Sequence, residues 1–282
     1  MCVGFQFFAA DETDNLQSND FYAPMLAGVQ AEASTLGLHL MLHTTNRHAM
    51  SQELPRMVME QAVGGMLVVG TADPGILAAF AEHVPQIVLL DNRDETGQFE
   101  SVISDGFGGA YAAVQHLLQL GHRRICFYNM VPEVTTFRDR LRGYRAAMND
   151  GGFGTEWQQV IFGRNQDECA SGFDALFRSA QPPTAIVTAN DAQALDVVRL
   201  SRNLGRKIPG DLSLIGFDDI PFTTYVHPTL TTVRVNKEYM GRLAVRRLYA
   251  QMQQALKNDP PEPAVCTHVP VSLVLRESCR PV

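Results

Sequence analysis

Polar and charged side chains follow several short apolar runs of this chain, and their types suit recognition of a hydroxylated molecule. The residues concerned are Asp91, Asn92 and Arg93; Asn190 and Asp191; Asp218 and Asp219; and, a little further after their run, Arg138 and Arg140. Carboxylates accept hydrogen bonds from hydroxyl groups, whereas Arg and Asn donate to hydroxyl and ring oxygens. The clustered carboxylates favour a neutral polyol or sugar, although Arg93 and Arg140 could accommodate an acidic ligand.

Helix capping is the alternative role for a polar residue after a strand, since Asp and Asn are common caps. We expect capping to explain Asp191 and Asp219. Asp91 and Asp218 each have a polar neighbour that could cap instead, so we expect them to contact a ligand. Arg140 is a further predicted contact. A positive charge near a helix start is unfavourable because of the helix dipole, and a ligand or a carboxylate would compensate for this cost.

The elements that must position these residues are short strands alternating with segments of helical period. The strand candidates are Val3–Phe8, Leu38–His43, Met66–Val69, Ile87–Leu90, Ile125–Tyr128, Val160–Phe162, Ala185–Thr188 and Leu212–Phe217. Such alternation is typical of an α/β fold with a parallel sheet and helices on both of its faces. Open sheets of this kind bind ligands outside the carboxyl ends of their strands, where the polar residues stand.

The number of strands indicates two sheets, and therefore two lobes. We expect residues 1–104 plus 231–259 to form the N-terminal lobe and residues 105–230 plus 260–282 to form the C-terminal lobe. The helix predicted over residues 237–256 returns to the first lobe, and the last strand, residues 269–275, returns to the second. Residues 258–263 contain three prolines and read as a surface connection.

Composition narrows the class of protein. The 282 residues carry 23 Lys and Arg against 30 Asp and Glu, a net charge of −7, and show no basic stripe, so we expect no direct DNA contact. No apolar stretch approaches the ~18 residues that span a membrane, and the N-terminus shows no signal peptide. Five scattered cysteines without C-x-x-C spacing predict reduced thiols in the cytoplasm.

Motifs for catalysis are missing from the sequence. There is no G-x-S-x-G elbow, and Gly106-Phe107-Gly108-Gly109 has neither dinucleotide-binding spacing nor the Lys-Ser/Thr of a P-loop. The eight histidines show no metal-ligand spacing. We therefore predict no catalytic residue, no metal and no cofactor, and a protein that is not an enzyme.

Several stretches, in order, resemble the effector-binding core of the LacI/GalR family of bacterial transcription regulators. They are residues 109–125, Arg140-Leu141-Arg142-Gly143-Tyr144, residues 184–194, 208–220 and 228–233, and Leu275-Arg276-Glu277-Ser278. The resemblance implies a two-lobed, periplasmic-binding-protein-like (type I) α/β fold with three crossings between the lobes. It also implies a small effector, usually a sugar, in the interlobe cleft.

By position, the resemblance assigns ligand contacts to Asp91, Arg140, Asn190 and Asp218, with Arg138 as a further candidate. It also implies that residues 10–21 close over the ligand, which adds Asp11 and Phe21. Family members are homodimers and bind DNA through a helix-turn-helix headpiece, which we expect this chain to lack because Met1 leads directly into the first strand.

The resulting prediction is the ligand-sensing domain of a transcriptional regulator of this family, with repression or activation left open. Two alternatives stay open, a sugar-binding protein of a transporter and an enzyme acting on a sugar or nucleoside. We expect Arg140→Ala or Asp218→Ala to abolish ligand binding and to leave the fold intact.

Overall fold

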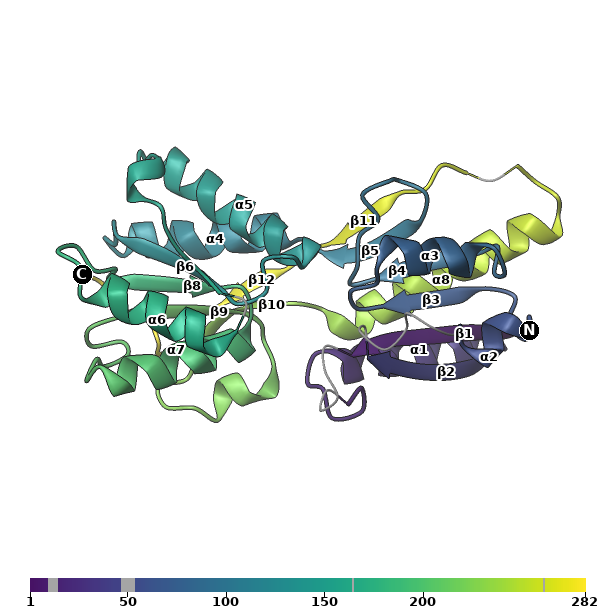
Figure 1. The fold of residues 1–282 in the computed structure, drawn as a ribbon, viewed down its shortest axis with the longest axis horizontal. Coiled ribbons are helices and arrows are strands. Elements are labelled where there is room, and N and C mark those ends of the chain that lie inside the picture. Colours follow the sequence, from purple (N-terminus) through teal and green to yellow (C-terminus); the bar gives the residue numbers. More distant parts are fainter. Residues whose placement is uncertain (10–14, 47–53, 164, 261) are drawn as a thin grey trace. The chain divides into compact units, whose positions relative to one another are not determined.

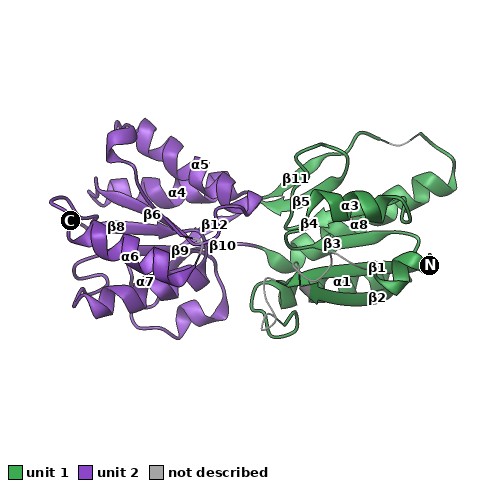
Figure 2. Cartoon of the chain, viewed as in Figure 1, with its two compact units in different colours: residues 1–104, 236–269 green, residues 105–235, 270–282 purple. Residues whose placement is uncertain are grey.

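The computed structural model describes residues 1–9, 15–46, 54–163, 165–260 and 262–282. The chain divides into two compact units (Figure 2). Unit 1 comprises Met1–Ser104 and Asn236–Val269, and unit 2 comprises Asp105–Val235 and Pro270–Val282. The chain thus passes from one unit to the other three times, as predicted.

Unit 1 is a six-stranded parallel sheet with helices on both faces (Figure 1). Its strands are β1 (Cys2–Ala9), β2 (His39–Asn46), β3 (Met66–Val69), β4 (Ile87–Leu90), β5 (Glu100–Ser104) and β11 (Cys266–Val269); its helices are α1 (Tyr22–Thr35), α2 (Arg56–Met59), α3 (Pro74–Ala81) and α8 (Lys237–Leu256). Met66 and Val68 point into the apolar cluster under α2 and α3. Successive strand residues face opposite sides, so Leu67 and Val69, equally buried, belong to the other face.

Unit 2 repeats this design. Its strands are β6 (Ile125–Asn129), β7 (Gln159–Phe162), β8 (Ala185–Thr188), β9 (Ser213–Asp218), β10 (Thr231–Arg234) and β12 (Ser272–Val274); its α-helices are α4 (Gly106–Gln119), α5 (Thr135–Asp150), α6 (Gln166–Phe177) and α7 (Asp191–Asn203). Phe173 of α6 and Val197 of α7 enter one apolar cluster with the strands. Helix α4 contacts β8, β9 and β10, and α5 packs against α4.

The two sheets share one strand order. It runs β2-β1-β3-β4-β5 in unit 1 and β7-β6-β8-β9-β10 in unit 2. In each sheet the order reverses beside the first strand, which is the kind of switch point where α/β sheets bind ligands. The sixth strands differ, because β11 is parallel to β5 whereas β12 is antiparallel to β10. The second sheet is therefore mostly rather than purely parallel.

Two segments lie in the other unit from the one predicted. β10 pairs with β9, so Thr231–Arg234 belongs to unit 2 rather than to the first lobe. β11 pairs with β5, so Cys266–Val269 belongs to unit 1 rather than to the second lobe. Because α8 starts directly after β10, the chain crosses from unit 2 to unit 1 between Val235 and Asn236. The proline-rich connection lies within unit 1.

Candidate functional site

Arg140 and Asp218 form a buried ion pair in unit 2. Arg140 Nη1 lies 3.2 Å from Asp218 Oδ1, and the two side chains are 1% and 6% exposed. The same guanidinium group donates a hydrogen bond to the carbonyl oxygen of Ala189, directly after β8. Helix α5 therefore delivers a positive charge to the carboxyl ends of β8 and β9.

Aromatic rings hold this guanidinium in place. Its central carbon lies 3.8 Å from the ring centroid of Phe217 and 5.0 Å from that of Phe137. Stacking on ring faces suits the planar guanidinium and stabilises its charge. Arg140 Nε is buried without a hydrogen-bond partner among the described residues. A polar ligand atom could satisfy this donor, which otherwise costs free energy.

Asn190, rather than Asp191, caps the helix that follows β8. Asn190 is the cap of α7, since its side-chain oxygen accepts a hydrogen bond from Gln193 N at 3.0 Å. Asp191 does not cap: its carboxylate accepts from Thr232 Oγ1 at 2.6 Å and from Ile220 N at 3.0 Å. The prediction that capping explains Asp191 was wrong, because the helix begins at Asp191 itself, one residue earlier than that role requires. Burial, and then repulsion from Asp218, raises the pKa of Asp191 to about 8.

Asp219, like Asp191, does not cap a helix. Its carboxylate binds Arg276 Nη2 at 2.6 Å and Arg234 Nε at 2.7 Å. Although partial burial raises the pKa of Asp219, hydrogen bonds and attraction from the two arginines more than offset it and leave the pKa below its usual value. Asp219 thus anchors the end of β9 to β10 and to the C-terminal segment.

In unit 1, Asp91 follows β4 and is 9% exposed. Tyr22, the first residue of α1, donates its hydroxyl hydrogen to Asp91 Oδ2 at 3.0 Å. Half-buried Phe21 packs edge to face on Tyr22, with ring centroids 5.1 Å apart, and lies 5.9 Å from the ammonium of Lys237. The polar and aromatic groups of this edge therefore include Tyr22, which the sequence analysis did not single out.

Two predicted contacts remain, Arg138 and Asp11. Arg138 is exposed on α5, two residues before Arg140. Asp11 lies outside the residues that the structure describes. Within unit 2 the structure thus brings Arg140, Asp218 and the Ala189 carbonyl together, and within unit 1 it brings Phe21, Tyr22 and Asp91 together.

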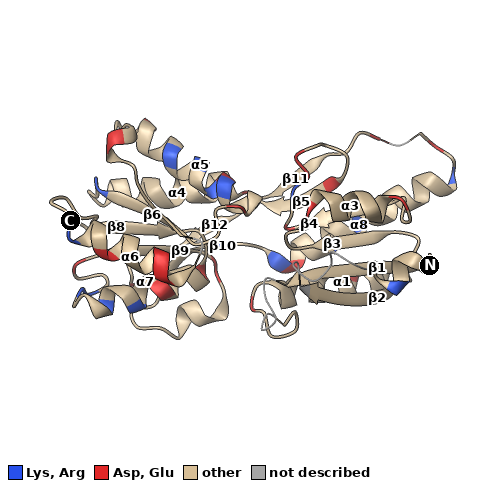
Figure 3. Cartoon of the chain, viewed as in Figure 1, with Lys and Arg blue, Asp and Glu red and all other residues tan. Residues whose placement is uncertain are grey.

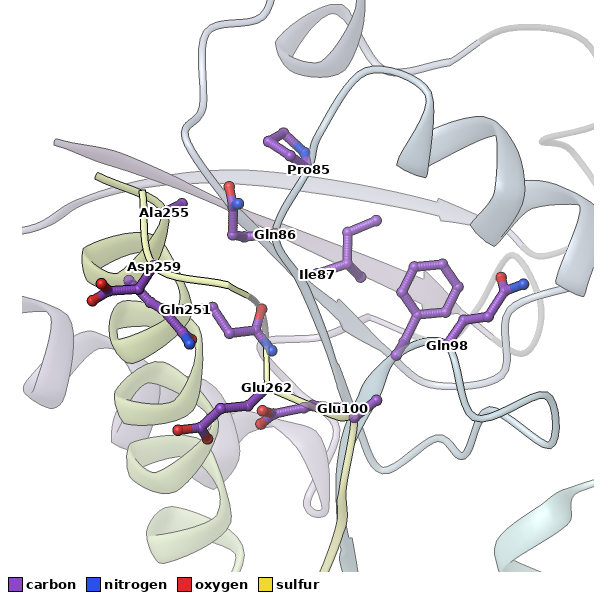
Figure 4. A pocket seen from close by; sticks show the side chains of 12 residues that line it. Pro85, Gln86, Ile87, Gln98, Glu100, Gln251, Ala255, Asp259 and Glu262 are labelled. Carbon is purple, nitrogen blue, oxygen red and sulfur yellow. The ribbon is translucent and has the colours of Figure 1, made fainter. Parts of the chain in front are cut away.

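A separate hollow of about 380 Å³ lies in unit 1, at the amino ends of β4 and β5 beside α8 (Figure 4). Its lining includes several glutamines and three carboxylates, Glu100, Asp259 and Glu262. The buried one, Glu100, already forms a bidentate pair with Arg247 at 2.7 and 2.8 Å. The hollow therefore shows no buried polar group that lacks a partner and points to a ligand.

The described part of the chain contains no cluster of three or more His, Cys, Asp or Glu residues arranged to hold a metal ion. No helix among the described residues is long and apolar enough to cross a membrane. Lys and Arg are scattered over both units with Asp and Glu between them (Figure 3).

Two sheets of one strand order, joined by three crossings, define the class of periplasmic-binding-protein-like domains. A model of the "Periplasmic binding protein-like domain" family matches residues 114–279. In addition, a LacI family regulator from Mycobacterium smegmatis has a TM-score of 0.82 at 28% identity, over 99% of each chain. One from Enterococcus faecium, solved with bound ribose, has a TM-score of 0.80 at 21% identity, over 100% of each chain.

Two named relatives show the family to which the chain belongs. The HTH-type transcriptional repressor CytR of Escherichia coli K12 is 30% identical over 83% of this chain and 69% of its own length. PurR of Photobacterium profundum, also an HTH-type transcriptional repressor, is 29% identical over 84% of this chain and 72% of its own. The chain belongs to the LacI family of transcriptional regulators.

Proposed function

We propose that this domain senses a small, neutral, sugar-like effector and that its polar strand ends hold that effector. The observation that carries the proposal is the buried pair of Arg140 and Asp218, stacked on Phe217 at the carboxyl end of β9. Acceptors from a carboxylate and donors from a guanidinium suit the hydroxyl and ring oxygens of a sugar. The ribose bound to the E. faecium regulator is consistent with this class of ligand.

We propose contacts in each unit separately. In unit 2 they are Arg140, Asp218, Asn190 and Arg138, and in unit 1 they are Asp91 and Phe21, with Asp11 added from outside the described residues. Asn190 uses its side-chain oxygen as a helix cap, which leaves its amide NH₂ group as the donor for a ligand. We include Tyr22 as a further contact because its hydroxyl already meets Asp91.

We propose that the effector acts by shifting the domain between two arrangements. A ligand that binds one arrangement more tightly increases the population of that arrangement. DNA binding then belongs to a helix-turn-helix segment joined to this domain, as the names of the HTH-type relatives suggest. The net charge of −7 argues against the domain itself as the DNA-binding part. We further propose that it acts as a cytoplasmic homodimer without enzymatic activity.

A thermal-shift screen of neutral sugars, sugar phosphates and purines tests the proposal, followed by calorimetry of the hits. A bound effector raises the melting temperature through mass action. We expect a neutral sugar to do so, and Asp91→Asn and Asp218→Asn to weaken its binding at least tenfold. Asp174→Asn, on the exposed part of α6, is the matched control and should leave affinity unchanged. Unchanged affinity in both site variants would remove these carboxylates from the site.

A further inference from the structure

Asp191 ties three elements of unit 2 together. It is the first residue of α7 and is 1% exposed. One oxygen of its carboxyl group meets Thr232 Oγ1 of β10 at 2.6 Å, and the other meets the backbone N–H of Ile220, just after β9, at 3.0 Å. A single side chain therefore fixes the start of α7, the turn after β9 and the strand that leads to the crossing at residues 235 and 236.

The carboxyl group of Asp191 also lies against the backbone of β9. A Cβ atom built on Gly216 would lie 2.0 Å from Asp191 Oδ1, so the side chain lies directly against the backbone at Gly216. Asp218 follows two residues later with a φ of 115°, a left-handed value that residues other than glycine rarely adopt. Such a conformation persists only where the surroundings enforce it. Asp191 is placed to enforce it, since its contacts flank Asp218 on both sides.

The charged groups around Asp191, among the residues that the structure describes, provide no counter-ion for it. The carboxylates nearby are Asp218 at the end of β9 and Asp219 directly after it. Three arginines of the described ranges face this region and form ion pairs, Arg140 with Asp218, and Arg234 and Arg276 with Asp219.

Among the described residues no Lys or Arg pairs with Asp191. Ionised, it would be a further buried negative charge beside Asp218, an arrangement that strongly disfavours ionisation. A neutral acid keeps both contacts, because the protonated Oδ1 can donate to Thr232 Oγ1 while Oδ2 accepts from Ile220 N–H. The raised pKa of Asp191 agrees with this geometry.

We propose that Asp191 is a positioning residue that, as a neutral carboxylic acid, holds the Asp218 turn and the start of α7 in place for effector binding. The inference rests on the proposed function in so far as Asp218 and Asn190 are effector contacts. Loss of the proton from Asp191 loosens the turn at Asp218, so the geometry of the site depends on pH.

The experiment compares the wild-type domain with Asp191→Asn and Asp191→Ala, without effector. Asn keeps the shape and the neutrality of the protonated acid, and Ala removes both contacts. A carboxyl group whose pKa is raised in the folded state stabilises most below its unfolded pKa, and this contribution is lost as pH rises toward the folded value. Relative to Asp191→Asn, we therefore expect the wild-type folding equilibrium constant to fall about tenfold per pH unit between about pH 5 and 7.

Hydrogen-exchange protection of residues 217–220 is the second readout. We expect it to fall in wild type between pH 7 and 9, to stay constant in Asp191→Asn and to be low throughout in Asp191→Ala. Asp174→Asn is the control, and its stability difference from wild type should not change over this range. A pH-independent difference between wild type and Asp191→Asn, or unaltered protection in Asp191→Ala, would overturn the inference. Neither readout needs an effector, so either result is independent of whether the proposed function holds.

Discussion

Asp91 and Asp218 occupy equivalent positions in the two sheets. Each stands at the carboxyl end of the fourth strand in the shared order, β4 in unit 1 and β9 in unit 2. Both have a positive φ, 54° at Asp91 and 115° at Asp218. Strained conformations of this kind cluster at functional sites, which supports one role for both carboxylates.

Their partners differ. Asp218 meets a buried guanidinium, whereas Asp91 accepts a hydrogen bond from the hydroxyl of Tyr22. A charged partner and a neutral one give the two carboxylates different sensitivity to substitution, and two of the predictions below depend on this difference.

Replacement of Arg140 by alanine should destabilise unit 2. Arg140 is 1% exposed, and its removal breaks the buried ion pair with Asp218. Breaking a buried pair in this way costs about 3–5 kcal/mol. The burial of Arg140 argues against the expectation that Arg140→Ala leaves the fold intact. Urea unfolding, followed by circular dichroism, measures the loss.

Arg142→Ala is the matched control for that measurement. Arg142 lies on the same helix and pairs with Asp139 at 3.1 Å, but its side chain is 68% exposed. An exposed pair contributes about 0–1 kcal/mol. Equal losses in the two variants would mean that burial of Arg140 has no energetic consequence.

Replacement of Gly28 by alanine should separate α1 from α8. A Cβ atom at Gly28 would lie 2.0 Å from the carbonyl oxygen of Glu238, and backbone cannot rotate away as a side chain can. Overpacking costs about 1–3 kcal/mol, more than the roughly 1 kcal/mol by which alanine improves helix propensity. We expect a lower melting temperature by differential scanning calorimetry.

Gly172→Ala on α6 provides the comparison for Gly28→Ala. The nearest atom to its added Cβ is Ile161 Cγ2 at 3.4 Å, an ordinary contact. Only the gain in helix propensity remains, so we expect this variant to be at least as stable as wild type. Destabilisation by Gly172→Ala as large as by Gly28→Ala would refute the role of close helix approach.

The strand candidates include the strongly apolar strands and omit β5, β10 and β11, which contain more polar residues. All residues of β5 are buried, yet only Val102 and Ile103 are large and apolar. Glu100 is tolerated there because Arg247 reaches it from α8. Glu100 and Arg247 are far apart in the sequence, so their pairing leaves no local pattern. For this reason β5 was not predicted.

The site shows the same limit. Asp91, Asp218 and Arg140 could be predicted because each follows or faces the end of a recognisable strand. The contacts of Asp191 with Thr232 and Ile220 could not, since they join segments distant in sequence. The choice of Asn190 over its neighbour as helix cap depends on where the helix begins to within one residue, which patterns do not resolve.

Tyr22→Phe should weaken effector binding while keeping unit 1 folded. The variant loses the hydroxyl that donates to Asp91 Oδ2 at 3.0 Å but keeps the ring, which packs against Phe7 with centroids 4.9 Å apart. A hydrogen bond to a charged group contributes about 1.5–3 kcal/mol. Part of that loss falls on the free protein, so we expect affinity for the sugar found in the screen to drop about 5- to 30-fold by isothermal titration calorimetry. Tyr225→Phe, whose residue is 81% exposed, should bind as wild type does. Equal affinity in the two variants would show that the orientation of Asp91 by Tyr22 plays no part in binding.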